Sequence, residues 1–204
     1  MVPAEVFKKY RMKRDTGQGL RELWLTNQRL ASLSHKIGSL LNLRTLGLAG
    51  NNLADLPETL FSLPRLERLI LSNNRLASMP DALGNLATLM ELRLDHNELE
   101  SLPAGIKSLR RMQRLSVSAN KISEIPSFLV GLRQLIEVDF SHNTLRWESV
   151  SALPWEEMSR QLQSISFQGN KEVFEAPPGL LCLEALEQIL LAGKSLSLPV
   201  GNQR

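Results

Sequence analysis

The apolar and polar residues of this chain follow a frame that returns every 23 residues. Within one copy, two leucines separated by one residue precede an asparagine, and further leucines and a proline follow it. One copy consists of Leu43, Leu46, Leu48, Asn51, Leu53, Leu56 and Pro57. Later copies keep the asparagine and change the apolar positions only conservatively. A fixed period over this length indicates a stack of similar structural units.

Each part of the frame predicts a local structure. Leu46 and Leu48 have the spacing that places both side chains on one face of a short β-strand. Repetition sets these strands side by side in a parallel sheet, about 4.8 Å apart. After the proline, leucines recur every three residues, as at Leu60 and Leu63, which favours a helical or 3₁₀ segment. That longer segment becomes the convex back, and the sheet becomes the concave face.

The asparagine marks the turn that leaves the strand. A turn buried between two coils contains backbone groups that need partners, and the asparagine side chain offers both a donor and an acceptor. We therefore expect a structural ladder from coil to coil. Its predicted members are Asn51, Asn74, Asn97, Asn120, Asn143 and Asn170.

The frame resembles the L-x-x-L-x-L-x-x-N-x-L signature of leucine-rich repeats. The resemblance covers residues 20 to about 198, and the repeat length is similar to that of the intracellular, Ras-group type. It implies an α/β solenoid of about eight coils, with a parallel concave β-sheet and a helical or 3₁₀ convex back. Members of that group are adaptors and scaffolds, so the resemblance also implies binding without catalysis.

Two departures from the frame lie near the C-terminus. The step from Asn143 to Asn170 is 27 residues, and the extra residues within 147–160 predict an enlarged helical back segment. In the last repeat, Lys194 takes the asparagine position, which suits a terminal coil with no further neighbour.

The N-terminal residues predict a different kind of element. Val6, Phe7 and Tyr10 lie on one side of a predicted helix, which we expect to shield the first coil. The chain is therefore expected to comprise a basic helical cap at 1–19, repeats at 20–185, and a terminal capping repeat with its tail at 186–204.

Basic charge is concentrated in the same N-terminal segment. Residues 1–14 contain five basic residues and one acidic residue, whereas the whole chain holds 24 basic and 21 acidic residues. The repeats are therefore nearly neutral, which argues against a nucleic-acid-binding surface on the solenoid.

Cysteine usage predicts the cellular compartment. Cys182 is the single cysteine, and its setting among leucines predicts core packing. The sequence has no Asn-x-Ser/Thr acceptor site, and no apolar run approaches the roughly 20 residues that span a bilayer. We expect a reducing intracellular compartment, cytoplasmic or cytoskeleton-associated.

Motifs for catalysis are weak. Gly193–Ser195 is similar to the end of a P-loop, but Gln188 stands where that loop needs glycine. His96 and His142 share a column of the predicted sheet, yet two strand spacings separate them by about 10 Å, too far to share a metal ion. We expect no catalytic residue, no metal, no cofactor and no small-molecule substrate.

The outward strand positions vary between copies and form columns on the concave face. One column alternates in charge and reads Glu22, Thr45, Arg68, Glu91, Arg114 and Glu137. These side chains either satisfy one another as a charge ladder or bind a polar partner.

The next column places Gly47 between Trp24 and Ile70, which predicts a dent. Either Trp24 lies across the glycine, or the apolar groups anchor a partner. Trp147 and Trp155 form a second candidate, with burial as the alternative. The predicted partner-binding residues are Trp24, Arg68, Ile70, Arg93, Asp95, His96, Trp147 and Trp155.

These patterns favour a non-catalytic protein-binding scaffold, or a structural subunit of a larger intracellular assembly with protein partners. A regulatory subunit of a signalling enzyme, such as a phosphatase, kinase or GTPase, is the alternative. Binding of RNA or a membrane through the basic N-terminal arm is a third hypothesis, which a steep salt dependence would support.

Overall fold

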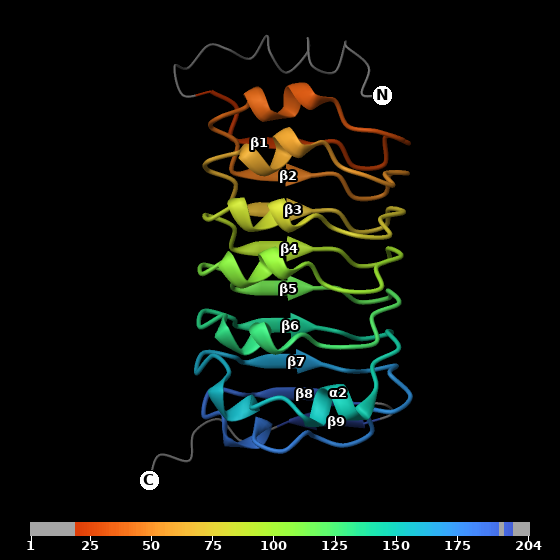
Figure 1. The fold of residues 1–204 in the computed structure, drawn as a ribbon, viewed down its shortest axis with the longest axis vertical. Coiled ribbons are helices and arrows are strands. Elements are labelled where there is room, and N and C mark those ends of the chain that lie inside the picture. Colours follow the sequence, from red (N-terminus) through yellow and green to blue (C-terminus); the bar gives the residue numbers. More distant parts are fainter. Residues whose placement is uncertain (1–18, 192–193, 198–204) are drawn as a thin grey trace.

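The computed structural model of this protein describes residues 19–191 and 194–197. The predicted solenoid is confirmed, because the strands of this part form a single sheet in chain order, β1 to β9 (Figure 1). The strands are β1 (Glu22–Trp24), β2 (Thr45–Gly47), β3 (Arg68–Ile70), β4 (Glu91–Arg93), β5 (Arg114–Ser116), β6 (Glu137–Asp139), β7 (Ser164–Ser166), β8 (Gln188–Leu191) and β9 (Lys194–Ser197). The first eight are parallel, and β9 is antiparallel to β8.

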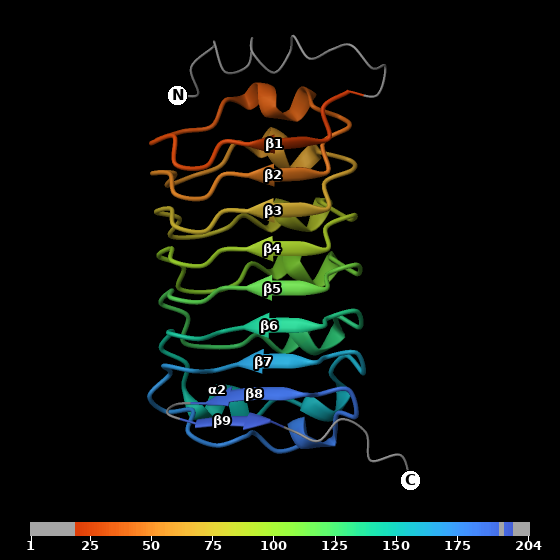
Figure 2. The same cartoon turned by 180° about the vertical axis from the view of Figure 1, so that it is seen from behind.

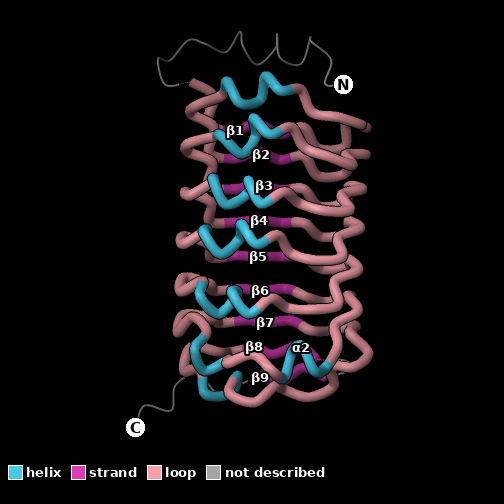
Figure 3. Tube along the Cα trace, in the orientation of Figure 1, coloured by secondary structure: helices cyan, strands magenta, loops and turns pink. Residues whose placement is uncertain are grey.

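Short helices form the opposite layer of the stack (Figures 1 and 3). They are the 3₁₀ helices η1 (His35–Ser39), η2 (Glu58–Ser62), η3 (Asp81–Asn85), η4 (Ala104–Ser108), η5 (Ser127–Gly131), η6 (Trp155–Glu157) and η7 (Leu180–Cys182), and the α-helix α2 (Trp147–Ser151). A proline caps the start of η2 through η5, where its fixed φ suits helix entry. Leucines three residues apart then fit a 3₁₀ helix, which has three residues per turn.

The core lies between the sheet and this back layer. Leu46 and Leu48 are fully buried, as their spacing predicts, and Leu60 packs from the back with no exposed area. Equivalent residues of every coil join them in one continuous apolar cluster. Because each coil covers the next, the stack buries aliphatic side chains along its whole length.

The asparagines lie in the turns between coils. Asn97 is 8% exposed, and its Nδ2 donates to the carbonyl oxygens of Leu71 and Leu94, both at 3.0 Å. Its Oδ1 accepts the Leu76 N–H at 3.0 Å. Asn170, after the irregular step, makes matching bonds and is fully buried. The side chains thus connect each coil with the one before it.

The residue before each ladder asparagine has a left-handed backbone, which the pattern analysis did not anticipate. This conformation is tolerated best by glycine, asparagine, aspartate and histidine. The positions are Gly50, Asn73, His96, Ala119, His142 and Gly169, and Asn27 has the same conformation before Gln28, the residue at the ladder position of the first coil. Most of these residue types suit the conformation, so their recurrence was an available sign of a tight turn.

The C-terminal end differs from the predicted coil. Lys194 begins the antiparallel strand β9, so within the described residues the chain turns back along β8 and forms no further parallel strand. The prediction that Lys194 occupies an asparagine-type turn is therefore wrong. Of the predicted helical cap at residues 1–19, residues 1–18 lie outside the described residues, so the cap stays a prediction.

Cys182 corrects another expectation. It is exposed, because Leu180 and Leu183 fill the inward positions of the η7 turn and leave the two residues between them facing outward. The predicted core packing of this cysteine is wrong.

Glycines set the spacing of the back helices. A Cβ on Gly84 would lie 2.6 Å from the carbonyl oxygen of Gly105, and a Cβ on Gly38 would lie 2.8 Å from that of Thr59. Backbones therefore touch between η3 and η4 and between η1 and η2. A Cβ on Gly131, in η5, would meet no atom closer than 4.0 Å. The back is close-packed at these pairs and looser near η5.

Candidate partner-binding face

Figure 2 shows the strands from the sheet side. The outward side chains of these strands make up the concave face. Because the parallel strands are in register, equivalent positions of successive coils are neighbours, as Glu22, Thr45 and Arg68 are. The sheet therefore holds its side chains in fixed rows without ordering a loop, which reduces the entropy lost on binding.

The predicted dent beside Trp24 is filled. A Cβ built on Gly47 would lie 2.1 Å from Cε3 of the Trp24 ring, so the indole lies directly across the glycine. The ring remains 50% exposed, and its Nε1 donates to Glu22 at 3.3 Å. In the structure the Trp24 ring covers the Gly47 backbone, which is one of the two alternatives given for this column. The expectation of an open hollow at this position is wrong.

The charged column forms separate pairs. Arg68 reaches Glu22 at 3.5 Å and donates to Thr45 Oγ1 at 3.0 Å. Arg114 pairs with Glu137 at 3.2 Å. All these charged side chains are substantially exposed, so each pair contributes about 0–1 kcal/mol to stability.

Glu91 interrupts this charged column. It pairs within its own strand, with Arg93 at 2.6 Å. The charges therefore partly satisfy one another, in line with the ladder interpretation, but they do not form a continuous ladder.

Asp95 and His96, both predicted to contact a partner, have structural surroundings of their own. Asp95 accepts hydrogen bonds from the Ser72 hydroxyl at 3.0 Å, from the Ser118 N–H at 3.2 Å and from the Ser116 hydroxyl. It therefore ties β3, β4 and β5 together beyond their strand ends. His96 is exposed and has a φ of 53° in the turn.

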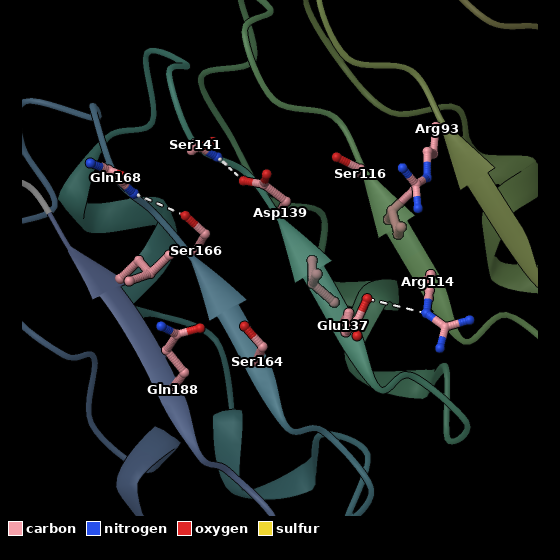
Figure 4. A pocket seen from close by; sticks show the side chains of 13 residues that line it. Arg93, Arg114, Ser116, Glu137, Asp139, Ser141, Ser164, Ser166, Gln168 and Gln188 are labelled. Atoms are coloured by element: carbon pink, nitrogen blue, oxygen red, sulfur yellow. Dashed lines mark hydrogen bonds and ion pairs between the residues drawn. The ribbon is translucent and has the colours of Figure 1, made fainter. Parts of the chain in front are cut away.

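A hollow of about 450 Å³ lies farther along the same face, over β4 to β8 (Figure 4). Its polar lining residues are Arg93, Arg114, Ser116, Glu137, Asp139, Ser141, Ser164, Ser166, Gln168 and Gln188, and Leu190 adds an apolar edge. Ser116 and Ser166, on either side of Asp139, leave room at the strand position where other coils carry arginine, isoleucine or tryptophan. The hollow thus results from small side chains on neighbouring strands.

Part of the lining is already hydrogen-bonded. Asp139 Oδ1 accepts the Ser141 N–H at 2.8 Å, and the Ser166 hydroxyl accepts the Gln168 N–H at 3.4 Å. The side chains of Ser164 and Gln188 make no hydrogen bond within the described part of the chain (Figure 4). The hollow therefore presents free donors and acceptors beside carboxylates and guanidinium groups.

The hollow lies at a different position from the predicted partner-binding site. Of the predicted partner-binding residues, Arg93 lines the hollow, whereas Trp24, Arg68 and Ile70 lie on earlier strands outside it. The serines did not stand out in the sequence because each offers little area to bury by itself. Their repetition at Ser116, Ser141, Ser164 and Ser166 was the available sign of a hollow.

The two tryptophans of the enlarged back segment differ in burial. Trp155 is fully buried, its Nε1 donates to the Val150 carbonyl at 2.7 Å, and its ring meets Phe167 edge-on at 5.8 Å. Trp155 is thus a core residue, and its predicted partner contact is wrong. Trp147 is half-buried and stacks on Phe174, which is exposed.

Two kinds of feature are absent from the described part of the chain. No group of three or more His, Cys, Asp or Glu side chains among residues 19–191 and 194–197 is arranged to hold a metal ion. No helix in this part of the chain is both long and apolar enough to cross a membrane.

The chain matches the family model described as leucine rich repeat three times, over residues 18–76, 65–122 and 87–145. No curated protein matches it. Among solved structures, a leucine-rich-repeat protein of Leptospira interrogans is 30% identical with a TM-score of 0.76, over 84% of this chain and 42% of that one. The plant peptide hormone receptor RGFR1, in complex with RGF2, is 26% identical with a TM-score of 0.68, over 85% of this chain and 32% of the receptor.

An internalin, inlF, of Listeria monocytogenes shares the fold alone, at 19% identity and a TM-score of 0.61, over 84% of this chain and 54% of that one. The chain therefore spans less than two thirds of the length of each of these three structures. The finer assignment to the Ras-group type stays a prediction.

Proposed function

This chain belongs to the leucine-rich-repeat family, and from that premise we propose that it is a non-catalytic scaffold that holds a segment of a protein partner in the hollow over β4 to β8. Proteins of this family generally mediate protein–protein interactions. The plant receptor among the similar structures is in complex with RGF2 and is described as a peptide hormone receptor. The observation that carries the proposal is the polar hollow itself, because it offers unpaired hydrogen-bonding groups on a rigid sheet.

The shape of the hollow favours a polypeptide over a small molecule. Pockets for small molecules are mostly apolar and enclosed, whereas this hollow lies open across five strands and is lined mainly by polar groups. Serine hydroxyls and glutamine amides can pair with the N–H and C=O groups of an extended chain. A segment that crosses the strands advances about three residues for every two strands, because strands lie about 4.8 Å apart and an extended chain rises about 3.3 Å per residue.

The charges of the lining suggest an orientation for that segment. Arg93 and Arg114 lie toward the β4 side, and Glu137 and Asp139 follow on β6. A partner segment with an acidic side chain near β4 and β5, and a basic side chain about three residues away near β6, complements this order. Bidentate pairing of arginine with a carboxylate adds both strength and direction.

A displayed library of random linear peptides tests the proposal. Peptides that bind the purified chain are sequenced and synthesised, and their affinities are measured by fluorescence anisotropy. Ser164→Trp fills the hollow with a neutral side chain, and Ser108→Trp places the same side chain on the exposed surface of η4 as the control. We expect Ser164→Trp to weaken binding by about tenfold or more and Ser108→Trp to leave it unchanged.

Either of two outcomes overturns this function. The selected peptides bind both tryptophan variants equally, or they show no common order of acidic and basic residues. Circular dichroism confirms first that each variant is folded. Membership of a multi-subunit assembly and an intracellular location stay predictions from the sequence.

A further inference from the structure

An exposed aromatic pair lies away from the concave face. Trp147 begins α2, and Phe174 lies in the turn that follows Asn170. Their ring centroids are 6.0 Å apart and the planes are inclined by 21°, a stacked arrangement. Phe174 is nevertheless 56% exposed, so stacking on Trp147 leaves much of the ring in solvent.

The pair occupies positions that are polar in the regular coils. Trp147 and Phe174 each lie four residues after a ladder asparagine. The residues at the same distance in the preceding coils are Asp55, Ser78, Ser101 and Glu124. Trp147 is partly buried against the core, but Phe174 is largely exposed and gains little stability by burial, so a binding role explains its exposed ring better than folding does.

A groove of about 550 Å³ adjoins α2. Arg146 and Glu148, the two chain neighbours of Trp147, both line it. Its lining also includes the apolar residues Ile125 and Leu153 and the acidic residue Glu124. Figure 1 shows α2 in the helical layer, on the face opposite the sheet that carries the hollow.

Carboxylates surround the aromatic pair. The backbone N–H of Trp147 donates to Glu172 Oε2 at 3.3 Å, which holds that carboxylate beside the stacked rings. Glu148 and Glu175 are the chain neighbours of the two aromatic residues, and both are exposed. Arg146, the chain neighbour of Trp147, pairs with Glu124 at 3.7 Å. The surface combines exposed π-faces with excess negative charge.

We propose that this aromatic–acidic surface, formed by Trp147, Phe174, Glu148, Glu172 and Glu175 with the adjoining groove, is a second docking site that binds an arginine-containing basic segment of a protein partner. An arginine guanidinium lies over the exposed ring of Phe174 and pairs with the Glu172 carboxylate. Its aliphatic neighbours enter the groove. Arginine is favoured over lysine because its planar group both stacks on a ring and forms bidentate hydrogen bonds.

This site is independent of the concave hollow, so two partners, or two segments of one partner, can bind together. The probes are three short fluorescein-labelled peptides that alternate leucine with arginine, with lysine or with glutamate. Binding to the whole chain is followed by anisotropy at low and at physiological salt. We expect the arginine peptide to bind several-fold more tightly than the lysine peptide, and the glutamate peptide not to bind.

Variants locate the site. Phe174→Ala and Glu172→Gln are each expected to weaken binding of the arginine peptide by about fivefold or more. Two variants serve as controls. Leu41→Ala removes another exposed hydrophobic side chain at the opposite end of the stack, and Glu58→Gln removes an exposed carboxylate from η2. Neither control should alter binding of the arginine peptide. Because Phe174 is largely exposed, its replacement should also leave the melting temperature unchanged.

Three results overturn the proposal. One is equal affinity for the arginine and lysine peptides, which shows attraction by charge alone. Another is binding that Phe174→Ala and Glu172→Gln leave unchanged. The third is binding of the arginine peptide that Ser164→Trp abolishes, which assigns the peptide to the concave hollow and leaves the function proposed for that hollow intact.

Discussion

The hydrogen bonds of Asn97 allow the contribution of the asparagine ladder to the stability of the fold to be predicted. Replacing Asn97 with alanine removes three donated hydrogen bonds, to the carbonyl oxygens of Leu71, Leu94 and Asp95, and one accepted from the N–H of Leu76. The side chain is 8% exposed, so water replaces these bonds only in part. We predict that Asn97→Ala destabilises the fold without changing its architecture.

The four groups that lose a bond are not equally affected. The Asp95 carbonyl keeps the hydrogen bond from the N–H of Asn73 at 2.8 Å. The Leu71 and Leu94 carbonyls each keep a hydrogen bond from the neighbouring ladder asparagine, at 2.9 Å and 3.0 Å. The N–H of Leu76 has no second acceptor among the described residues, and Leu76 is fully buried. An orphaned buried donor costs about 1–3 kcal/mol, so we expect the free energy of unfolding to fall by that amount.

Guanidinium unfolding followed by circular dichroism measures this change. Asn85→Ala is the matched control, because Asn85 is exposed on η3 and outside the ladder. An unchanged m-value would show that both variants unfold through the same transition. A curve for Asn97→Ala that overlays those of the wild type and the control would refute the assignment of stability to the ladder.

Three further changes test the burial of Trp155, the position of the Trp24 ring over Gly47 and the predicted capping role of the N-terminal residues. Trp155→Ala should lower the free energy of unfolding by about 3–5 kcal/mol and Trp147→Ala by much less. If denaturant unfolding shows that both variants lose the same free energy, the burial described for Trp155 is contradicted. Gly47→Ala should displace the ring of Trp24 and increase acrylamide quenching of tryptophan fluorescence, and unchanged quenching would show that the ring rests elsewhere. Deleting residues 1–14 should lower the melting temperature and the solubility, whereas an unchanged melting temperature with lost partner binding would make the segment a docking element.

Periodic features of this molecule could be predicted because each coil has the same neighbours. Leu46 and Leu48 face the core in one coil, so the residues at the same positions face it in every other coil. The spacing of the asparagines located the turns for the same reason. A residue type that returns at a fixed interval therefore carries information about structure that one occurrence does not.

Features that depend on a single side-chain choice could not be predicted in this way. Composition left open whether Trp24 lies over Gly47 or beside it, because both arrangements satisfy the strand pattern. Trp155 and Trp147 belong to the same irregular segment, yet only Trp155 finds a buried acceptor for its indole N–H. Cys182 faces outward because of its phase in a three-residue turn, although its neighbours are leucines.

The hollow was missed for a related reason. Each lining serine is unremarkable by itself, and the cavity exists only because Ser116, Ser141, Ser164 and Ser166 meet across adjacent strands. Identifying a missing volume requires the register of the strands in addition to the residue type. The same applies to the stacking of Trp147 on Phe174, which joins residues from successive coils.

The spacing of the back helices has a mechanical consequence. Where Gly84 meets Gly105, backbone touches backbone, so that part of the stack resists compression. Near Gly131 the gap is bridged by the flexible Arg110 side chain, whose guanidinium donates to the Gly131 carbonyl at 3.4 Å. We therefore expect the stack to bend more easily around η5 than between η3 and η4. Such bending would change the spacing of the strands beneath the hollow, so residues on the back would influence how tightly the front holds a bound segment.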